Sequence, residues 1–255
     1  MKTLIKIGGT LLDSPEVRDD LARGIAGAHR AGHELAVVHG GGKQITRYLD
    51  ARGIESRFVN GMRVTTPEIL EAVLTVLRMV NREFAQALRD AGAPAVEVFV
   101  DDGTLVEAEQ MDPDLGAVGR VIRCHSERLA GSGLAVVACV AGDKAGNRYN
   151  VNGDQMAVAY AAGMRADRLI FLTDVNGVLD TEGRVLPFLT AKAAMALIAN
   201  GIAKGGMQAK LNAAVSALQQ GVREVRIVSG TLPGAAGFAL FLDSAGDPYG
   251  TAIAI

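Results

Sequence analysis

The chain opens with short apolar runs that alternate with amphipathic segments. Residues 4–7 and 35–38 are apolar runs of strand length, and each leads to a cluster of glycines. Apolar residues recur at helical spacing over 17–28, and residues 43–52 show the pattern of a second helix. This β-α-β-α order predicts a parallel sheet that is covered by helices.

The longest apolar pattern begins at Pro67 and continues to about Ala91. Proline is well tolerated in the first turn of a helix. One apolar stripe, and a second set beside it, follow at helical spacing: Ile69, Val73, Leu77, Val80, Phe84 and Leu88, then Leu70, Leu74 and Met79. A helix with this much apolar surface requires burial on more than one side. It is therefore either central in the fold or in contact with another subunit.

The rest of the chain continues the alternation of strands and helices. Strands are predicted over 95–100, 104–108, 117–122, 134–140, 168–172 and 224–228, with a hairpin arm over 147–151 and a final edge strand through 250–253. Helices are predicted over 125–131, 153–162, 190–200 and 207–220. Neither repeats nor an obvious flexible linker divide the sequence, so we expect a single domain over residues 1–255.

Composition and charge argue against several classes of function. The 255 residues are 49% hydrophobic and carry a net charge of −2, without the basic excess of a nucleic-acid or anionic membrane surface. No apolar run approaches membrane-spanning length, and no signal peptide is apparent after Met1. Cys124 and Cys139 form neither a zinc nor a redox pattern. We therefore expect free thiols and a cytoplasmic protein.

Two glycine clusters, Gly8-Gly9 and Gly40-Gly41-Gly42, stand where the first two predicted strands end. In open α/β sheets, ligands bind beyond the carboxyl ends of the strands. Glycines there let backbone N–H groups approach a phosphate closely. Each cluster alone could be a tight turn, but the two together favour anion binding. Neither matches a P-loop or a GxGxxG fingerprint, so any nucleotide is bound by another design.

Four charged residues stand near these strand ends and other turns. Lys6 interrupts an apolar strand, which is costly unless the lysine meets a counter-charge or a ligand, or faces water from an edge strand. Asp154 and Lys210 each open a predicted helix, and read alone they are a capping residue and a solvated lysine. Arg63 lies in a loop, where its planar fork could clamp a carboxylate. His39 is read as a packed or turn histidine.

Six segments, in this order along nearly the whole chain, resemble the acetylglutamate kinases of the amino acid kinase family. They are Lys6-Ile7-Gly8-Gly9, His39-Gly40-Gly41-Gly42, Asn60-Gly61-Met62-Arg63-Val64-Thr65, Asn150-Val151-Asn152-Gly153-Asp154, Thr173-Asp174-Val175-Asn176-Gly177-Val178-Leu179 and Gly205-Gly206-Met207-Gln208-Ala209-Lys210. One departure is Gly153, where many relatives have alanine. The region over 97–119 is less distinctive, so the sequence leaves the acyl group open.

The resemblance implies an α/β fold, an open αβα sandwich with a mainly parallel central sheet. It implies that about 1–165 bind the acceptor and form a homodimer, and that about 166–255 bind the nucleotide. The implied reaction is ATP-dependent phosphorylation of the side-chain carboxylate of N-acetyl-L-glutamate, in arginine biosynthesis. Mg²⁺ would be held mainly by the phosphates of ATP, with no metal ligands from the protein.

The resemblance also assigns roles to residues. Lys6 and Lys210 would stabilise the transferring phosphoryl group, and Asp154 would hold both lysines. The acylamino acid would be bound by Gly41, Gly42, Arg63, Asn150 and Asn152. The nucleotide would be bound by Gly8, Gly9, Asp174, Val175, Asn176, Gly177, Leu179, Lys204, Gly206 and Met207. Because the attacking carboxylate is already ionised at neutral pH, this chemistry requires no general base.

Other activities remain open at this point. The acceptor could be another acylamino acid, N-succinylglutamate or carrier-bound aminoadipate, although the net charge of −2 argues mildly against a docking surface for a carrier. A catalytically inactive, ligand-sensing relative is the alternative from another class. Arginine-inhibited relatives carry an additional helix before the first strand. Since only five residues precede Lys6, we expect a dimer that is insensitive to arginine.

Overall fold

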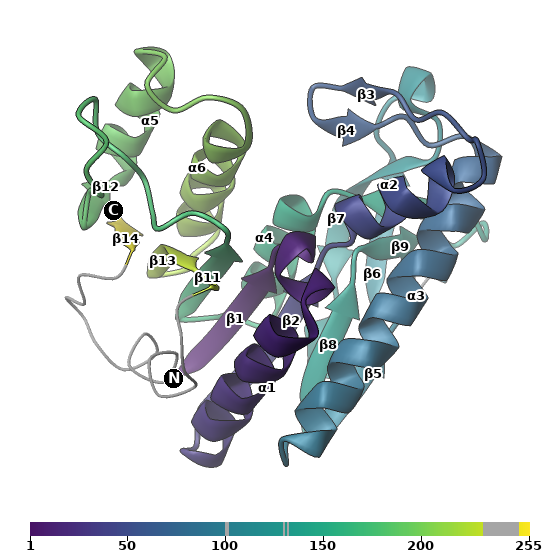
Figure 1. Cartoon of the computed structure of the whole chain (residues 1–255), viewed down its shortest axis with the longest axis horizontal. Coiled ribbons are helices and arrows are strands. Elements are labelled where there is room, and N and C mark those ends of the chain that lie inside the picture. The colour runs from purple at the N-terminus through teal and green to yellow at the C-terminus, as the bar shows by residue number, and fades with distance from the viewer. Residues whose placement is uncertain (100–101, 130, 132, 232–249) are drawn as a thin grey trace.

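The fold is built on an eight-stranded sheet with the order β12-β14-β13-β11-β1-β2-β8-β5 (Figure 1). The computed structural model describes residues 1–99, 102–129, 131, 133–231 and 250–255. The strands are β1 (Lys2–Ile7), β2 (Glu34–His39), β5 (Ala95–Val98), β8 (Leu134–Ala138), β11 (Arg168–Thr173), β12 (Phe188–Thr190), β13 (Glu224–Ser229) and β14 (Thr251–Ala254). All neighbouring strands run parallel except β13 and β14. The predicted α/β class with a mainly parallel sheet is confirmed.

Helices cover both faces of the sheet, which explains why its central strands are almost wholly apolar. Helices α1 (Pro15–Arg30) and α3 (Pro67–Asp90) pack side by side over β2, β5 and β8 (Figure 1). On the other face α4 (Gly153–Gly163) and α6 (Gly205–Gln219) pack together against β1, β11 and β13. The shorter helices are α2 (Gly42–Asp50), against α3, and α5 (Ala191–Ala199), against α6. The result is the expected αβα sandwich.

Both apolar sides of helix α3 are buried within one chain. Leu77 and Phe84 on the main stripe are at most 1% exposed, and Leu74 on the second side is 5% exposed. Helices α1 and α2 supply much of the covering surface. Met79, at 50% exposed, is an exception. The apolar pattern is therefore explained by a central position in the fold and does not itself require a second subunit.

A second, smaller sheet stands beyond the edge of the main one. It closes on itself through β6 (Val106–Gln110), β7 (Val118–Cys124), β9 (Val140–Gly142) and β10 (Arg148–Val151). Nearby, β3 (Phe58–Val59) and β4 (Met62–Arg63) form a hairpin. Its turn places Asn60 and Gly61 at φ values of 50° and 77°, which is the reason for the Asn-Gly pair. The described connections include three 3₁₀ helices: Gly9–Asp13, Pro113–Leu115 and Ser126–Leu129.

Several predicted elements differ from the structure. The strand predicted over 134–140 divides at Cys139, because the chain leaves the main sheet and enters the smaller one as β9. The helix predicted over 125–131 is only a 3₁₀ turn at Ser126–Leu129. The strand through 250–253 is not an edge strand, since β12 lies outside it. Val100 and Ala130, at the ends of two predicted elements, lie outside the described residues. No helix in the described parts is long and apolar enough to cross a membrane.

Candidate active site

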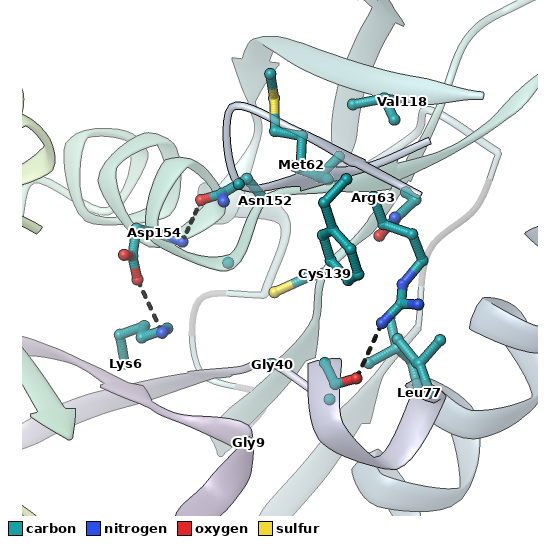
Figure 2. A pocket seen from close by; sticks show the side chains of 18 residues that line it. Lys6, Gly9, Gly40, Met62, Arg63, Leu77, Val118, Cys139, Asn152 and Asp154 are labelled. Carbon is teal, nitrogen blue, oxygen red and sulfur yellow. Dashed lines mark hydrogen bonds and ion pairs between the residues drawn. The ribbon is translucent and has the colours of Figure 1, made fainter. Parts of the chain in front are cut away.

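A cavity of about 240 Å³ lies beyond the carboxyl ends of β1 and β2 (Figure 2). The β3–β4 hairpin, α3 and the start of α4 complete its wall. It brings together residues that the sequence motifs predicted from distant parts of the chain: Lys6, Gly9, Gly41, Gly42, Arg63, Asn150, Asn152 and Asp154. Their convergence on one cavity is what the order of motifs alone could not demonstrate.

Lys6 and Asp154 form a buried ion pair at one side of this cavity (Figure 2). Lys6 is 8% exposed in the central strand β1, so it is not an edge-strand lysine facing water. Its Nζ lies 2.8 Å from Asp154 Oδ1, and Lys210 Nζ lies 3.9 Å from Asp154 Oδ2. The capping role considered for Asp154 belongs to Asn152, whose Oδ1 accepts hydrogen bonds from the N–H groups of Asp154 and Gln155.

The charges of this cluster depend on one another. Burial acts to raise the pKa of Asp154, but the ammonium groups of Lys6 and Lys210 outweigh it and hold that pKa below its usual range. Burial lowers the pKa of Lys210, while Asp154 and Asp174 oppose this effect. Two cations thus share the single buried carboxylate of Asp154. The excess positive charge favours an anion beside the two lysines.

The two glycine clusters lie against each other beside this charge. A Cβ on Gly9 would lie 3.1 Å from the nitrogen of Gly41, and a Cβ on Gly41 would lie 2.7 Å from Leu77 Cδ2. Only glycine therefore fits at these two positions without displacement. The side chain of Gln44 ties the loops together, since its Nε2 donates to Gly9 O at 2.8 Å. Gly8 does not line the cavity; its N–H donates to Leu172 O.

Arg63 lies on the opposite side of the cavity and is 6% exposed (Figure 2). Its Nη2 donates to Gly42 O at 3.1 Å and to Thr46 Oγ1 at 2.8 Å, and its Nη1 donates to Ser56 Oγ. The ring of Phe58 stacks on the guanidinium, with 4.6 Å between its centroid and Cζ. Burial lowers the pKa of Arg63, opposed by Asp50, yet a guanidinium stays protonated in proteins.

The two predicted amide ligands are partly engaged by the protein. Asn150 Nδ2 donates to Thr65 Oγ1 at 3.1 Å. Asn152 commits its oxygen to the first turn of α4 and leaves its Nδ2 for a ligand. Both side chains line the cavity, so the structure agrees with their predicted location and leaves their ligands as a prediction.

Of the residues predicted to bind nucleotide, Gly9 lines this cavity and the others do not. Asp174, Val175, Asn176, Gly177 and Leu179 follow β11, while Lys204, Gly206 and Met207 lie at the start of α6. The loop after β11 is anchored to β14, because the N–H of Val178 donates to Thr251 Oγ1 at 2.8 Å. Val175 and Leu179 are 42% and 47% exposed. Asp174 acts on the pKa of Lys210, so this loop stands beside the charged cluster.

The family model described as "Amino acid kinase family" matches residues 1–229. This chain belongs to the amino acid kinase family. The acetylglutamate kinase of Solibacter usitatus (strain Ellin6076) is 60% identical over 240 residues, 92% of this chain and 93% of the relative. The acetylglutamate kinase of Paracoccus denitrificans (strain Pd 1222) is 42% identical over 246 residues, 94% of this chain and 81% of the relative. The predicted family resemblance is confirmed.

Solved structures with the same fold include two with different activities in their names. N-acetylglutamate synthase from Neisseria gonorrhoeae, complexed with coenzyme A and N-acetyl-glutamate, has a TM-score of 0.86 at 23% identity. This amino acid kinase chain is covered completely in that comparison and spans 59% of the synthase chain. Carbamate kinase from Giardia lamblia bound to AMP-PNP has a TM-score of 0.71 at 17% identity, with 99% and 98% of the two chains covered. At these identities the likeness concerns the fold alone.

Apolar residues of the cavity in this amino acid kinase were missed by sequence reasoning. They are Ile45, Phe58, Met62, Leu77, Val118 and Cys139. Leu77 belongs to the helical stripe of α3, and that stripe gave no sign that one member reaches a cavity. Phe58 stands in a turn-rich stretch, where a large apolar residue outside any periodic pattern was the available signal.

Proposed function

We propose that this amino acid kinase transfers the terminal phosphoryl group of ATP to the side-chain carboxylate of N-acetyl-L-glutamate. The observation that carries the proposal is the pair Lys6 and Lys210 held by Asp154 at one side of a cavity, with Arg63 at the other. An acceptor with two carboxylates would place one beside the lysines and the other beside Arg63. The two acetylglutamate kinases described above, at 60% and 42% identity, support the same substrate.

The chemistry follows from the charges. A carboxylate oxygen of the acceptor attacks the γ-phosphorus, and the bond from that phosphorus to the β,γ-bridging oxygen breaks. The bridging oxygen leaves with the electron pair as part of ADP, and the product is an acyl phosphate. Two anions must approach each other, so the protein's task is to neutralise charge rather than to move a proton. Lys6 and Lys210 can each donate to the equatorial oxygens while Asp154 fixes their positions.

Backbone groups complete the site for the phosphoryl group. Helix α2 begins at Gly42, with no side-chain cap at Gly41, so the N–H groups of its first turn remain available to an anion. Gly9 and Gly41 let the two loops approach closely enough to enclose an oxygen atom. Mg²⁺ would enter with the phosphates of ATP, because Asp154 is already engaged by two lysines.

Arg63 is the proposed partner of the acceptor's α-carboxylate. Its guanidinium donates to neutral oxygens of Gly42, Thr46 and Ser56, so its charge has no carboxylate partner among these contacts. A carboxylate would replace these neutral acceptors with an ion pair of matching planar geometry, which adds charge attraction and specificity. Asn150 and Asn152 would hold the acylamino group. The nucleotide would lie over 174–179 and 204–207, on the other side of the lysines.

A hydroxamate assay tests the proposal directly. Acyl phosphates react with hydroxylamine, so ATP-dependent hydroxamate formation reports the product. We expect activity with N-acetylglutamate and far less with N-succinylglutamate, glutamate and aspartate. Activity confined to N-succinylglutamate would change the acyl group, and no activity with any of the four would overturn the proposed reaction.

Assembly and location are further parts of the proposal. The family resemblance supports a homodimer, while the burial of α3 within one chain removes the argument from its apolar pattern. Sedimentation at micromolar concentration is expected to give twice the mass of the 26.6 kDa chain. As an enzyme of arginine biosynthesis, the protein would work in the cytoplasm.

A further inference from the structure

The glycine loop over 40–42 rests on one face of α3. Leu77 and Asn81 lie one helical turn apart and therefore project from the same face. Leu77 stands against Gly41, and Asn81 Nδ2 lies 2.9 Å from Nε2 of His39, the residue that precedes the loop. All three side chains are buried, with His39 0% and Asn81 1% exposed. Helix α3 thus supports the loop at two successive turns.

Asn81 determines which nitrogen of His39 carries the proton. The Nδ2 of Asn81 also lies 2.8 Å from Val136 O, and a carbonyl oxygen can only accept a hydrogen bond. The amide group at this position is therefore NH₂, and its second hydrogen is directed to Nε2 of His39. A neutral imidazole that accepts at Nε2 is protonated at Nδ1. Burial keeps the ring neutral, since it lowers the pKa of His39 to about 4, against a smaller opposing effect of the Gly40 carbonyl.

The proton at Nδ1 holds the peptide that joins Gly40 to Gly41. Nδ1 of His39 lies 3.0 Å from Gly40 O. The described residues contain no cis peptide bond, and in a trans peptide the C=O and N–H groups point in opposite directions. With its carbonyl held toward the imidazole, this peptide turns the N–H of Gly41 away from it. That nitrogen lies next to Gly9, where the two glycine loops lie against each other.

We propose that His39 is a positioning residue for phosphoryl transfer, which aims the N–H of Gly41 at the phosphoryl oxygens through the hydrogen bond to Gly40 O. Asn81 selects the tautomer that makes this bond. The inference rests on the proposed function. The proposed role also explains why Asn81 is buried. Its Oδ1 has no hydrogen-bond partner among the described residues, and a leucine at this position would avoid the free-energy cost of burying that oxygen. The thiol of Cys139 donates to His39 O at 2.9 Å and steadies the same backbone.

Two substitutions at one position separate positioning from packing. Asparagine at 39 places an amide nitrogen near the position of Nδ1 and can still donate to Gly40 O, whereas glutamine reaches toward Nε2 and Asn81 instead. We expect His39→Gln to lower kcat about 10- to 100-fold with both KM values within about threefold. His39→Asn should remain within about fivefold of the wild-type kcat. Leu88→Ala, buried at the far end of α3, is the matched control: it should lower the melting temperature and leave kcat unchanged.

NMR can test the protonation of His39 without any substrate. With ¹⁵N-labelled histidine, the shifts of His39, assigned with the His39→Gln variant among the four histidines, should report a proton on Nδ1 at pH 7. Asn81→Leu should redistribute it between the two nitrogens. A proton on Nε2, or equal kcat for His39→Gln and His39→Asn, would overturn the inference. A wild-type protein that forms no hydroxamate would instead overturn the proposed reaction. The NMR result would still show whether His39 donates a hydrogen bond to Gly40 O.

Discussion

The proposed acceptor side and the proposed nucleotide side of this protein are built differently. The acceptor side, lined by Gly41, Gly42, Arg63 and Asn150, is a cavity whose polar groups already bond to one another or to neighbouring residues. The nucleotide side, residues 174–179 and 204–207, is an open surface with exposed Val175 and Leu179. The charged cluster of Lys6, Asp154 and Lys210 stands between the two.

The difference indicates where each side obtains its selectivity. A preformed cavity of about 240 Å³ discriminates by size and by the placement of charge before any ligand arrives. An open surface discriminates through the area that its ligand covers, and it lets a large substrate enter and leave. In the proposed reaction, the acceptor would therefore have to fit an arrangement of groups that is already made. The nucleotide would instead complete its own site when it binds.

The largest expected effect lies between the two sides. Lys6→Ala or Lys210→Ala should lower kcat by about 2–4 kcal/mol of transition-state stabilisation, with smaller changes in either KM. Asp154→Asn should reproduce the loss without unfolding the protein, because Asn152 caps α4. Steady-state kinetics with Lys192→Ala, an exposed lysine of α5, as control measures this. If both lysine variants turn over within a few-fold of wild type, the two-lysine mechanism is wrong.

Buried His39, next to the glycine loop over 40–42, should make the free energy of unfolding depend on pH. His39 has a folded pKa of about 4 against 6.5 for a free side chain, so the unfolded chain takes up this proton first as pH falls. Its contribution is full above pH 6.5 and is lost between pH 6.5 and 4, by on the order of 3 kcal/mol. Urea unfolding across this range should show a shallower slope for His39→Gln. The thiol of Cys139 has a pKa near 12 and does not titrate in the same range. Parallel slopes for the two proteins would contradict the burial of a neutral imidazole.

Arg63→Ala should separate the two sides kinetically. Loss of a charged hydrogen-bonding partner should raise the KM for N-acetylglutamate by about 1.5–3 kcal/mol, or roughly 10- to 150-fold. The KM for ATP should change little, because Arg63 lies across the cavity from Lys6 (Figure 2). Arg57→Ala, exposed on the same hairpin segment, is the control. An equal rise for both substrates would place Arg63 in a shared role.

The reverse separation is expected at Leu179. This side chain is 47% exposed, so its replacement should cost the fold little. If ATP covers it, Leu179→Ser should raise the KM for ATP by about 1 kcal/mol, close to fivefold, through lost apolar contact. The KM for N-acetylglutamate should stay constant. Phe188→Ser, at a similarly exposed apolar residue of β12, provides the comparison. An unchanged KM for ATP would remove Leu179 from the nucleotide site.

The smallest effect concerns Gly153. A Cβ there would lie 3.3 Å from Lys6 Cε and 3.4 Å from Cys139 Sγ, so Lys6 must shift by only tenths of an ångström. Alanine is favoured over glycine in a helix by up to about 1 kcal/mol. Gly153→Ala should therefore leave the melting temperature equal or slightly higher, with kcat within about threefold. Gly41→Ala, which meets Leu77 at 2.7 Å, should be clearly worse on both measures.

The fold was more accessible to sequence reasoning than the details of the site. Buried strands such as β2 and β8 are continuous apolar runs, and their helices have clear periodicity, so the parallel sheet was predictable. The division at Cys139 and the three-residue β12 were not, because both depend on which strands pair across the sheet. The periodicity of apolar residues indicates which side of a helix or strand is buried. It does not indicate which other strand or helix that side packs against.

The same reason limits what the motifs established about the site. Read alone, Asp154 was a helix cap and Lys210 a solvated lysine; only the resemblance joined them to Lys6, and only the structure shows the contacts. His39 is packed, as its pattern indicated. Its bond to Asn81 joins residues 42 positions apart, and a single asparagine within an apolar stripe was the only trace of it.

The position of β14 has a consequence for how the chain is made. This strand lies between β13 and β12, and in the described part of the sheet β12 pairs with it alone. The ribosome produces β12 and β13 before residues 251–254 emerge, so for a time both strands present unpaired edges. Such edges are where nascent chains associate wrongly. Thr251, whose hydroxyl also anchors the loop after β11, therefore arrives after both of these strands, and the proposed nucleotide side takes its final form only then.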